Sequence, residues 1–167
     1  MLINLIGIAI SVLKYKFFGI RTPIVASIGV TSKCNLKCEY CYAEVDNLNG
    51  KDWPFEDLKE IIDRLHSLGT RVIMLQGGEP LLHTRIDDII EYVKSKNIYC
   101  SITTNSYTFS KHIDAIKKLD QVQLSVDGDQ EIMDSYRGQG AYEQVVLAAK
   151  MCDENNIPFH LHSVVTN

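Results

Sequence analysis

The sequence predicts an α/β protein in which parallel strands alternate with helices. Two observations support this class: five short apolar runs typical of strands recur along the chain, and segments with a helical period of apolar residues separate them. Strands joined by helical crossovers pair in parallel, and such crossovers are right-handed in nearly all known cases. The pattern therefore predicts either a doubly wound sheet or part of a βα barrel.

Each expected element has a local signature. The expected strands cover residues 24–30, 71–75, 98–104, 121–126 and 157–165, and the expected helices cover residues 55–69, 85–97, 111–119 and 141–155. In the first of these helices Leu58, Ile62 and Leu65 recur at helical spacing, and Gly69 ends it. Residues 127–140 are expected to connect the fourth strand to the last helix. Loops that follow parallel strands lie at the carboxyl edge of the sheet, so the chemistry is expected there.

Residues 1–20 are expected to form an amino-terminal apolar helix, and residues 21–167 one core domain. The first charge is Lys14, so the apolar run has thirteen uncharged residues, fewer than the ~18 needed to cross a bilayer. A signal peptide is disfavoured because the positive charges follow the apolar run. The helix is expected to pack on the domain. The alternative is weak contact with a membrane surface, which Lys14, Lys16 and Arg21 would support.

The composition excludes some classes of function. The chain has 167 residues, of which 46% are hydrophobic and 23% charged, with a net charge of -4, as is typical of a globular domain. Lys and Arg are scattered, so no nucleic-acid partner is expected. Five cysteines, with Cys100 and Cys152 alone in apolar stretches, do not suit a disulfide framework. A reducing, cytoplasmic location is therefore expected.

The number of repeating units indicates an incomplete barrel. A complete eight-unit βα barrel takes ~250 residues, or roughly 31 per unit, and the residues after Ile20 hold about five such units. The fifth strand would end close to Asn167 with no helix to cover that edge, and an exposed edge strand is a liability. The domain is therefore expected to be incomplete at its carboxyl end, unless a partner chain covers the edge.

The most distinctive feature is a cysteine triplet with the spacing C-x3-C-x2-C at Cys34, Cys38 and Cys41. A structural zinc site is disfavoured because it takes four ligands, and no histidine has ligand spacing to the triplet. Chance placement of thiols is also a weak explanation, since the triplet lies in a polar loop after a strand. The third interpretation is an iron-sulfur cluster, which three thiolates would hold with one iron left open.

The segment CNLKCEYC resembles the signature of the radical SAM superfamily, with Tyr40 at its aromatic position. The resemblance continues through GGEP (77–80), TTNS (103–106), LSVDG (124–128) and YRGQGAYEQVV (136–146), and it covers residues 24–167. The last two segments look most like the SPASM/twitch branch, whose maturases modify peptides and proteins. The resemblance implies a partial βα barrel of the radical SAM type, with about five of the family's six units present.

The resemblance also implies two cofactors. Cys34, Cys38 and Cys41 would hold a 4Fe-4S cluster, and S-adenosylmethionine (SAM) would bind beside it. By their positions in the family's motifs, the residues contacting SAM would be Tyr40, Gly77, Gly78, Glu79, Pro80, Asn105, Ser125, Asp127 and Arg137. The glycines would bring backbone carbonyls close to the amino group of SAM, and Arg137 would pair with its carboxylate. For Asn105 and Asp127 a simple turn role is an equal alternative.

The function implied by the resemblance is that of a redox enzyme. It would cleave SAM reductively to a 5'-deoxyadenosyl radical, which would abstract hydrogen from a substrate such as a peptide or protein. An electron donor such as a flavodoxin or ferredoxin would be its partner. No catalytic residue of the chain is assigned, and cofactor or lipid biosynthesis stays open. The alternative is a truncated, catalytically incompetent iron-sulfur or partner-binding fragment, because the sequence holds only five units.

Overall fold

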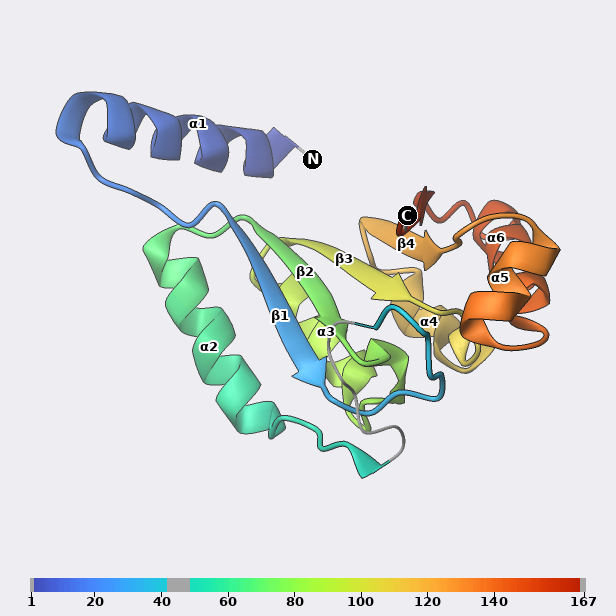
Figure 1. Ribbon diagram of the computed structural model, residues 1–167. Helices are drawn as coiled ribbons and strands as arrows, with labels where there is room; N and C mark the ends of the chain where they lie inside the picture. The colour runs from blue at the N-terminus through green and yellow to red at the C-terminus, as the bar shows by residue number, and fades with distance from the viewer. Residues whose placement is uncertain (1, 42–48, 166–167) are drawn as a thin grey trace.

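The sheet of the protein is an open arc of five parallel strands. In the computed structural model, which describes residues 2–41 and 49–165, the strands are β1 (Val25–Thr31), β2 (Val72–Gly77), β3 (Tyr99–Thr104), β4 (Gln121–Ser125) and β5 (Phe159–His162). Their order in the sheet is the same as their order in the chain (Figure 1). A doubly wound sheet would reverse its order at a switch point. The sequential order therefore confirms an α/β partial barrel.

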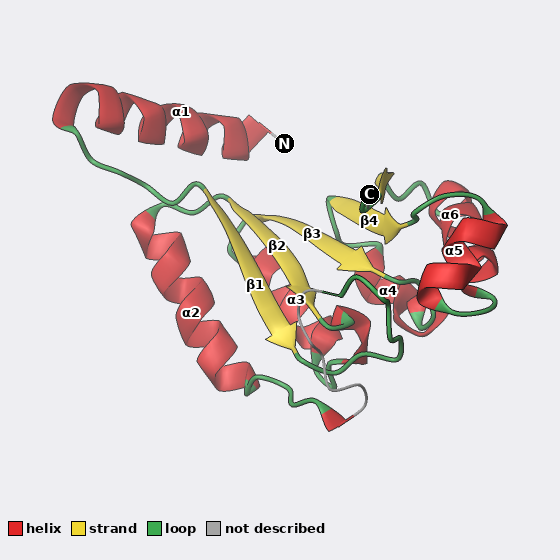
Figure 2. Cartoon of the chain, viewed as in Figure 1, coloured by secondary structure: helices red, strands yellow, loops and turns green. Residues whose placement is uncertain are grey.

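Helices α2 to α6 lie in the connections between consecutive strands (Figure 2). The helices are α1 (Leu2–Phe18), α2 (Phe55–Leu68), α3 (Ile86–Ser95), α4 (Ile113–Ile116), α5 (Gln130–Arg137) and α6 (Ala141–Glu154), with 3-10 turns η2 (Pro80–Leu82) and η3 (Phe109–His112). Local chemistry explains the bounds of α2. Glu56 and Asp57 lie in its first turn, where the helix dipole favours negative charge, and Gly69 ends it with a left-handed φ of 102°.

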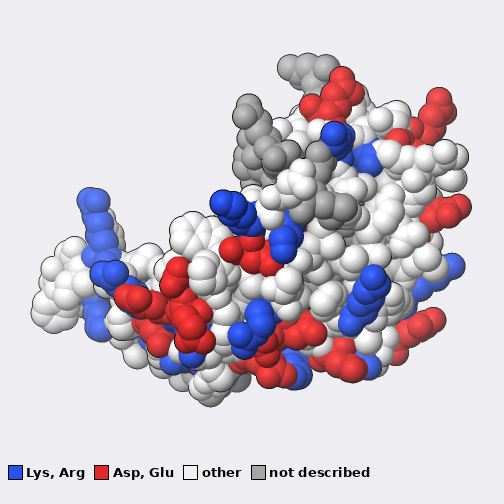
Figure 3. All heavy atoms as spheres, turned by 90° about the horizontal axis from the view of Figure 1, so that it is seen from below, with Lys and Arg blue, Asp and Glu red and all other residues white. Residues whose placement is uncertain are grey.

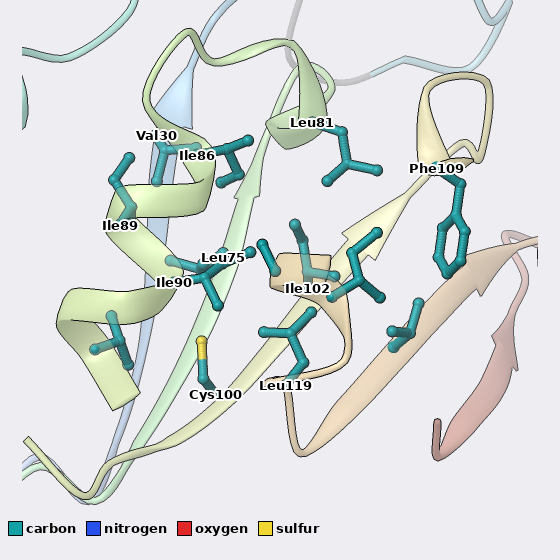
Figure 4. Packing of buried hydrophobic residues seen from close by; sticks show 14 of the residues in the cluster. Val30, Leu75, Leu81, Ile86, Ile89, Ile90, Cys100, Ile102, Phe109 and Leu119 are labelled. Atoms are coloured by element: carbon teal, nitrogen blue, oxygen red, sulfur yellow. The ribbon is translucent and has the colours of Figure 1, made fainter. Parts of the chain in front are cut away.

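The core lies between the sheet and the helices that cover one of its faces. Figure 4 shows Ile90 of α3 packed beside Leu75 of β2, and Ile89 packed beside Val30 of β1. Alternate residues of the strands point into this layer because successive side chains of a strand point to opposite faces. Cys100 and Cys152 are completely buried within the core.

The opposite face of the sheet carries polar side chains. Leu75 pairs with Ile102, so Gln76 and Thr103 are neighbours, and Thr103 pairs with Gln123, which pairs with His160. The hydroxyl of Thr103 donates a hydrogen bond of 3.0 Å to Oε1 of Gln123. We call Gln76, Thr103, Gln123 and His160 the polar row. It crosses four strands on the face that the core helices do not cover.

Three elements differ from the sequence-based expectation. The helix expected at 111–119 is much shorter, because η3 occupies its start and only Ile113–Ile116 are α-helical, with Phe109 and Ile116 both buried. Helix α5 lies in residues expected to form a connection; Asp129 caps it by accepting a hydrogen bond of 3.1 Å from the Ile132 amide. Strand β5 covers four residues of the nine expected.

Helix α1 forms where an apolar helix is expected, and its Gly7 lies against the side chain of Arg71, the residue before β2. None of the described helices is long and apolar enough to span a membrane. On the face drawn in Figure 3, basic and acidic side chains are interspersed. This pattern differs from α1 itself, which carries lysines and no acidic residue.

Candidate active site

One cleft at the carboxyl ends of the strands gathers most of the expected site residues. Its lining includes Cys34, Cys38 and Cys41, and also Tyr40, Gly77, Gly78, Glu79, Asn105, Ser125 and Arg137. Two expected residues lie outside this lining: Pro80 is buried at the start of η2, and Asp127 lies behind Arg137. The sheet therefore brings segments 70 or more residues apart in the sequence to one place.

The cysteine loop follows β1 directly. The amide of Leu36 lies 3.5 Å from the Cys34 sulfur, and the amide of Cys41 donates a 3.1 Å hydrogen bond to the Cys38 carbonyl. Burial raises the pKa of the Cys34 thiol, and the charges of Glu79 and the other two thiols raise it further. The three cysteines line the same cleft.

The end of β2 is pressed against the cysteine loop. The amide of Gly78 donates to the Thr31 carbonyl at 2.9 Å, and the amide of Glu79 donates to the Lys33 carbonyl at 2.7 Å. A Cβ on Gly78 would lie 2.2 Å from the Lys33 carbonyl oxygen, and one on Gly77 would lie 2.3 Å from that of Thr31. Both positions therefore require glycine for the approach of the cysteine loop, a reason that the sequence alone does not reveal.

Glu79 joins β2 to β3. Its side chain is 1% exposed and accepts hydrogen bonds from the Asn105 amide at 2.6 Å, the Thr104 hydroxyl at 2.8 Å and the Leu81 amide at 3.1 Å. Burial raises the pKa of Glu79 to about 7, although these hydrogen bonds and the charge of Arg137 act in the opposite direction. The carboxylate thus holds two strand ends together at the edge of the cleft.

Asp127, Arg137 and Tyr40 form one hydrogen-bonded group. Arg137 donates from Nε and Nη2 to the two carboxylate oxygens of Asp127 at 2.5 and 3.2 Å, and the exposed fractions of the two side chains are 8% and 2%. The Tyr40 hydroxyl also donates to Asp127. Burial raises the pKa of Asp127, but the hydrogen bonds from Arg137 and Tyr40 outweigh it, so this pKa lies below its usual value. The group ties the cysteine loop to β4 and α5.

Asn105 directly follows β3, and Ser125 is the last residue of β4. The Asn105 side-chain amide donates to Oδ1 of Asn35 in the cysteine loop at 2.9 Å, while its own Oδ1 accepts from the Tyr107 amide at 3.3 Å. Asn105 thus makes a turn and also contacts the cysteine loop. Ser125 is 7% exposed, lines the cleft, and pairs in register with His162 of β5, which lines it too.

Several lining residues were not singled out from the sequence. Gln76 and Thr103 of the polar row line the cleft, as does Thr104. His162 of β5 lines it as well. Strand register identifies His162, which pairs with Ser125, and Gln76, Thr103 and Thr104 lie within one or two residues of expected site residues at the ends of β2 and β3.

The donor set fits an iron-sulfur cluster better than a single metal ion. Three thiols and two glycines share the cleft, and the two other cysteines lie in the core. Within the described residues, no three His, Cys, Asp or Glu side chains are grouped so that they could hold one ion. In a cubane cluster each thiolate binds a different iron, so its ligands stand farther apart than those of a mononuclear site. The residues present therefore fit the cluster.

The open βα barrel and the three-cysteine loop that faces a glycine pair are the features that the resemblance to the radical SAM superfamily implies. The sequence profile of the Radical SAM superfamily matches residues 28–167. The chain belongs to this superfamily. Its members use a 4Fe-4S cluster and SAM as cofactors.

The curated relatives have different activities. The chain is 32% identical over 152 residues to Fe-coproporphyrin III synthase of Methanosarcina barkeri, covering 87% of this chain and 37% of that protein. It is 35% identical over 134 residues to GTP 3',8-cyclase of Chlorobaculum tepidum, covering 77% and 40%. The chain spans 35% to 51% of the length of the first curated relatives that it matches.

Solved structures include similar peptide-bound proteins. Native anSMEcpe with bound AdoMet and Kp18Cys peptide is 28% identical, with a TM-score of 0.70, covering 85% of this chain and 43% of that chain. SuiB of Streptococcus suis bound to precursor peptide SuiA has a TM-score of 0.78 at 23% identity, covering 95% and 37%. The likeness to SuiB shows the fold alone.

Proposed function

We propose that this protein is a radical SAM enzyme whose cluster is held by Cys34, Cys38 and Cys41. The observation that carries the proposal is the opening of all three thiols onto one cleft, beside the glycine pair Gly77 and Gly78. Cluster and SAM together would supply a carbon-centred radical that removes a hydrogen atom from the substrate. The chain's own part is to bind SAM, to orient it and to shield the cleft from water.

The remaining residues have distinct parts in this proposal. Arg137 lines the cleft while Asp127 holds its guanidinium from behind, so it would present a fixed positive charge to the SAM carboxylate. Ser125 would offer its hydroxyl to the same ligand. Glu79 and Asn105 would keep the ends of β2 and β3 in place against the cysteine loop, with Pro80 setting the turn after Glu79. Tyr40 would position the loop through its hydrogen bond to Asp127.

We further propose a peptide segment as the substrate. Gln76 and Thr103 of the polar row line the cleft together with His162, and their uncharged amide, hydroxyl and imidazole groups suit a neutral ligand rich in hydrogen-bonding groups, such as a peptide backbone. A triphosphate or a polycarboxylate would call for several cations, and Arg137 is the only Lys or Arg among the described residues that line the cleft. The peptide bound to the 28% identical anSMEcpe also favours this substrate class.

The enzyme would need a reductant, and a flavodoxin or ferredoxin in the cytoplasm would supply it. The alternative is a fragment that keeps the cluster loop but does not turn over. The test is anaerobic reconstitution of the protein with iron and sulfide, followed by reduction and addition of SAM. We expect the visible absorption of an iron-sulfur cluster and the release of 5'-deoxyadenosine. Both should be lost in the variant Cys34→Ala/Cys38→Ala/Cys41→Ala. A cluster that assembles but yields no deoxyadenosine would favour the fragment.

The substrate proposal is tested separately on the reconstituted enzyme. A pool of unstructured peptides, GTP and iron-coproporphyrin III are each added with SAM, and deoxyadenosine is measured above the rate without substrate. We expect stimulation by the peptide pool alone. The variant Gln76→Ala, whose residue lines the cleft, should reduce that stimulation about 10-fold while keeping the basal rate, and Gln139→Ala, whose residue lies outside the lining, should keep both. Stimulation by GTP or by the porphyrin alone would contradict a peptide substrate.

A further inference from the structure

Helix α1 exposes most of its apolar side chains. The exposed residues are Ile6, Ile10, Val12, Leu13, Tyr15, Phe17, Phe18 and, just after the helix, Ile20, with exposed fractions between 47% and 76%. A surface helix of a globular protein normally turns its apolar stripe toward the core. Exposed apolar patches of this kind mark binding surfaces for membranes or proteins.

The contact of α1 with the domain is made by small residues. Ser11 is 6% exposed and donates a 3.0 Å hydrogen bond to the Gly7 carbonyl. A Cβ on Gly7 would lie 2.5 Å from Nε of Arg71, so the helix backbone rests directly on that side chain. Because the narrow side of Gly7 and Ser11 faces the domain, the large apolar residues face away from it. The helix therefore contacts the domain through its small residues and leaves its large apolar side chains exposed.

The charges around this surface have one sign. Lys14, Lys16 and Arg21 are the only charged residues among the first 32, and the first acidic residue is Glu39. Long basic side chains can place their stems on apolar surface and their charges in the headgroup region. Anionic lipids attract such residues, whereas a second copy of the same surface would bring like charges together. Charge complementarity therefore favours an anionic lipid surface over a second copy.

The length of α1 decides how it would meet a bilayer. Its 17 residues reach about 25 Å at 1.5 Å per residue, less than the ~30 Å of a hydrocarbon core. The helix would therefore lie in the interface and not cross it. Figure 1 places α1 at the amino end of β1, and the cysteine loop follows the opposite end of that strand. A lipid surface bound to α1 would leave the cleft edge open.

We propose that residues 6–21 bind the surface of an anionic membrane, with the apolar side chains of α1 in the interface and Lys14, Lys16 and Arg21 among the headgroups. Nothing in this proposal depends on the proposed enzymatic function. In this arrangement α1 lies at the membrane surface, and the cleft remains in water.

The experiment uses the full-length protein, purified without air, and flotation with vesicles of phosphatidylcholine alone or with about 30% phosphatidylglycerol. We expect at least about 10-fold stronger partitioning into the anionic vesicles, decreasing as salt is raised. Phe17→Ser/Phe18→Ser should lose binding to both, and Lys14→Gln/Lys16→Gln should lose about 10-fold on anionic vesicles only. The matched controls Leu147→Ser, at an exposed apolar position of α6, and Lys150→Gln should bind like the wild type.

Two results would overturn the proposal. One is the absence of flotation with anionic vesicles at low salt, which would mean that another part of the full-length protein covers α1. The other is a dimer in sedimentation that Phe17→Ser/Phe18→Ser dissociates, without lipid binding by the wild type, which would assign the surface to a second copy. Circular dichroism of each variant checks that the domain is folded.

Discussion

The two faces of the sheet differ in composition although alternate residues of the same strands build them. Leu75 is completely buried beneath α3, while the next residue, Gln76, lines the cleft. Ile102 and Thr103 repeat this division on β3. One face therefore supplies the free energy of folding, and the other supplies groups for a ligand. The comparison implies that stability and chemistry can be changed separately by mutations one residue apart.

The largest predicted effect is on cluster assembly. It is expected for a substitution at the glycine-rich end of β2, where the two faces of the sheet meet. In Gly78→Ala the new Cβ would lie 2.2 Å from the Lys33 carbonyl oxygen, so the cysteine loop must move. We expect the iron content after reconstitution to fall about 10-fold or more, measured by iron and sulfide analysis. Gly29→Ala is the control, since a Cβ there meets nothing within 4 Å. Equal iron content in both variants would show that the loop does not depend on this contact.

The helix-covered face is tested by truncating Leu75. Leu75→Ala should lower the free energy of unfolding by about 2–5 kcal/mol, because it removes fully buried methyl groups and leaves a cavity. Gln76→Ala should change it by less than about 0.5 kcal/mol. Urea titration of the apo protein measures both values. Comparable losses in the two variants would mean that the polar face also carries folding energy.

The buried pair of Asp127 and Arg137 joins stability to the cleft. Asp127→Asn should cost roughly 1–3 kcal/mol near pH 7, because Arg137 stays buried with a neutral partner. The pKa of Asp127 is lowered in the folded protein, so its stabilisation is complete above the unfolded value of ~3.9 and is lost as the pH falls below it.

Urea titrations between pH 7 and pH 3 measure this dependence. The difference between wild type and Asp127→Asn should stay constant down to about pH 5 and shrink toward pH 3. Asp88→Asn, which removes an exposed ion pair with Arg85, should change stability by less than about 1 kcal/mol. A difference between wild type and Asp127→Asn that is independent of pH would rule out the ion pair as its source.

The smallest effect is expected on the polar row itself. Thr103→Val removes the hydrogen bond to Gln123 and keeps the shape of the side chain. Because Thr103 is only partly buried, the free energy of unfolding should change by about 0.5–1 kcal/mol at most. Urea titration beside Thr103→Ser, which keeps the hydroxyl, separates the hydrogen bond from the packing of the methyl group. A loss as large as that of Leu75→Ala would remove the distinction between the faces.

Local patterns were sufficient to predict the strands and the cysteine loop. In the sequence, each strand of the sheet corresponds to an apolar run that is followed by turn residues. The spacing of Cys34, Cys38 and Cys41 likewise depends only on residues close together in the chain. Helix α5 was missed because Met133 is its only fully buried apolar residue, and glycines flank it on both sides. Its stability depends on the Asp129 cap and on packing against α6, which a pattern of apolar residues does not reveal.

The sequence by itself determined the alternation of strands and helices, the cysteine triplet and the apolar character of the first helix, because each depends on residues close together in the chain. Tertiary structure alone decided the partners of distant residues. It placed Asp127 against Arg137 and Tyr40 and brought Gly78 to the Lys33 carbonyl. It also placed Gly7 of α1 against Arg71, which leaves the apolar side chains of the helix exposed. Such contacts follow from strand order and register, which the packing of the whole sheet selects and which no short segment of sequence encodes.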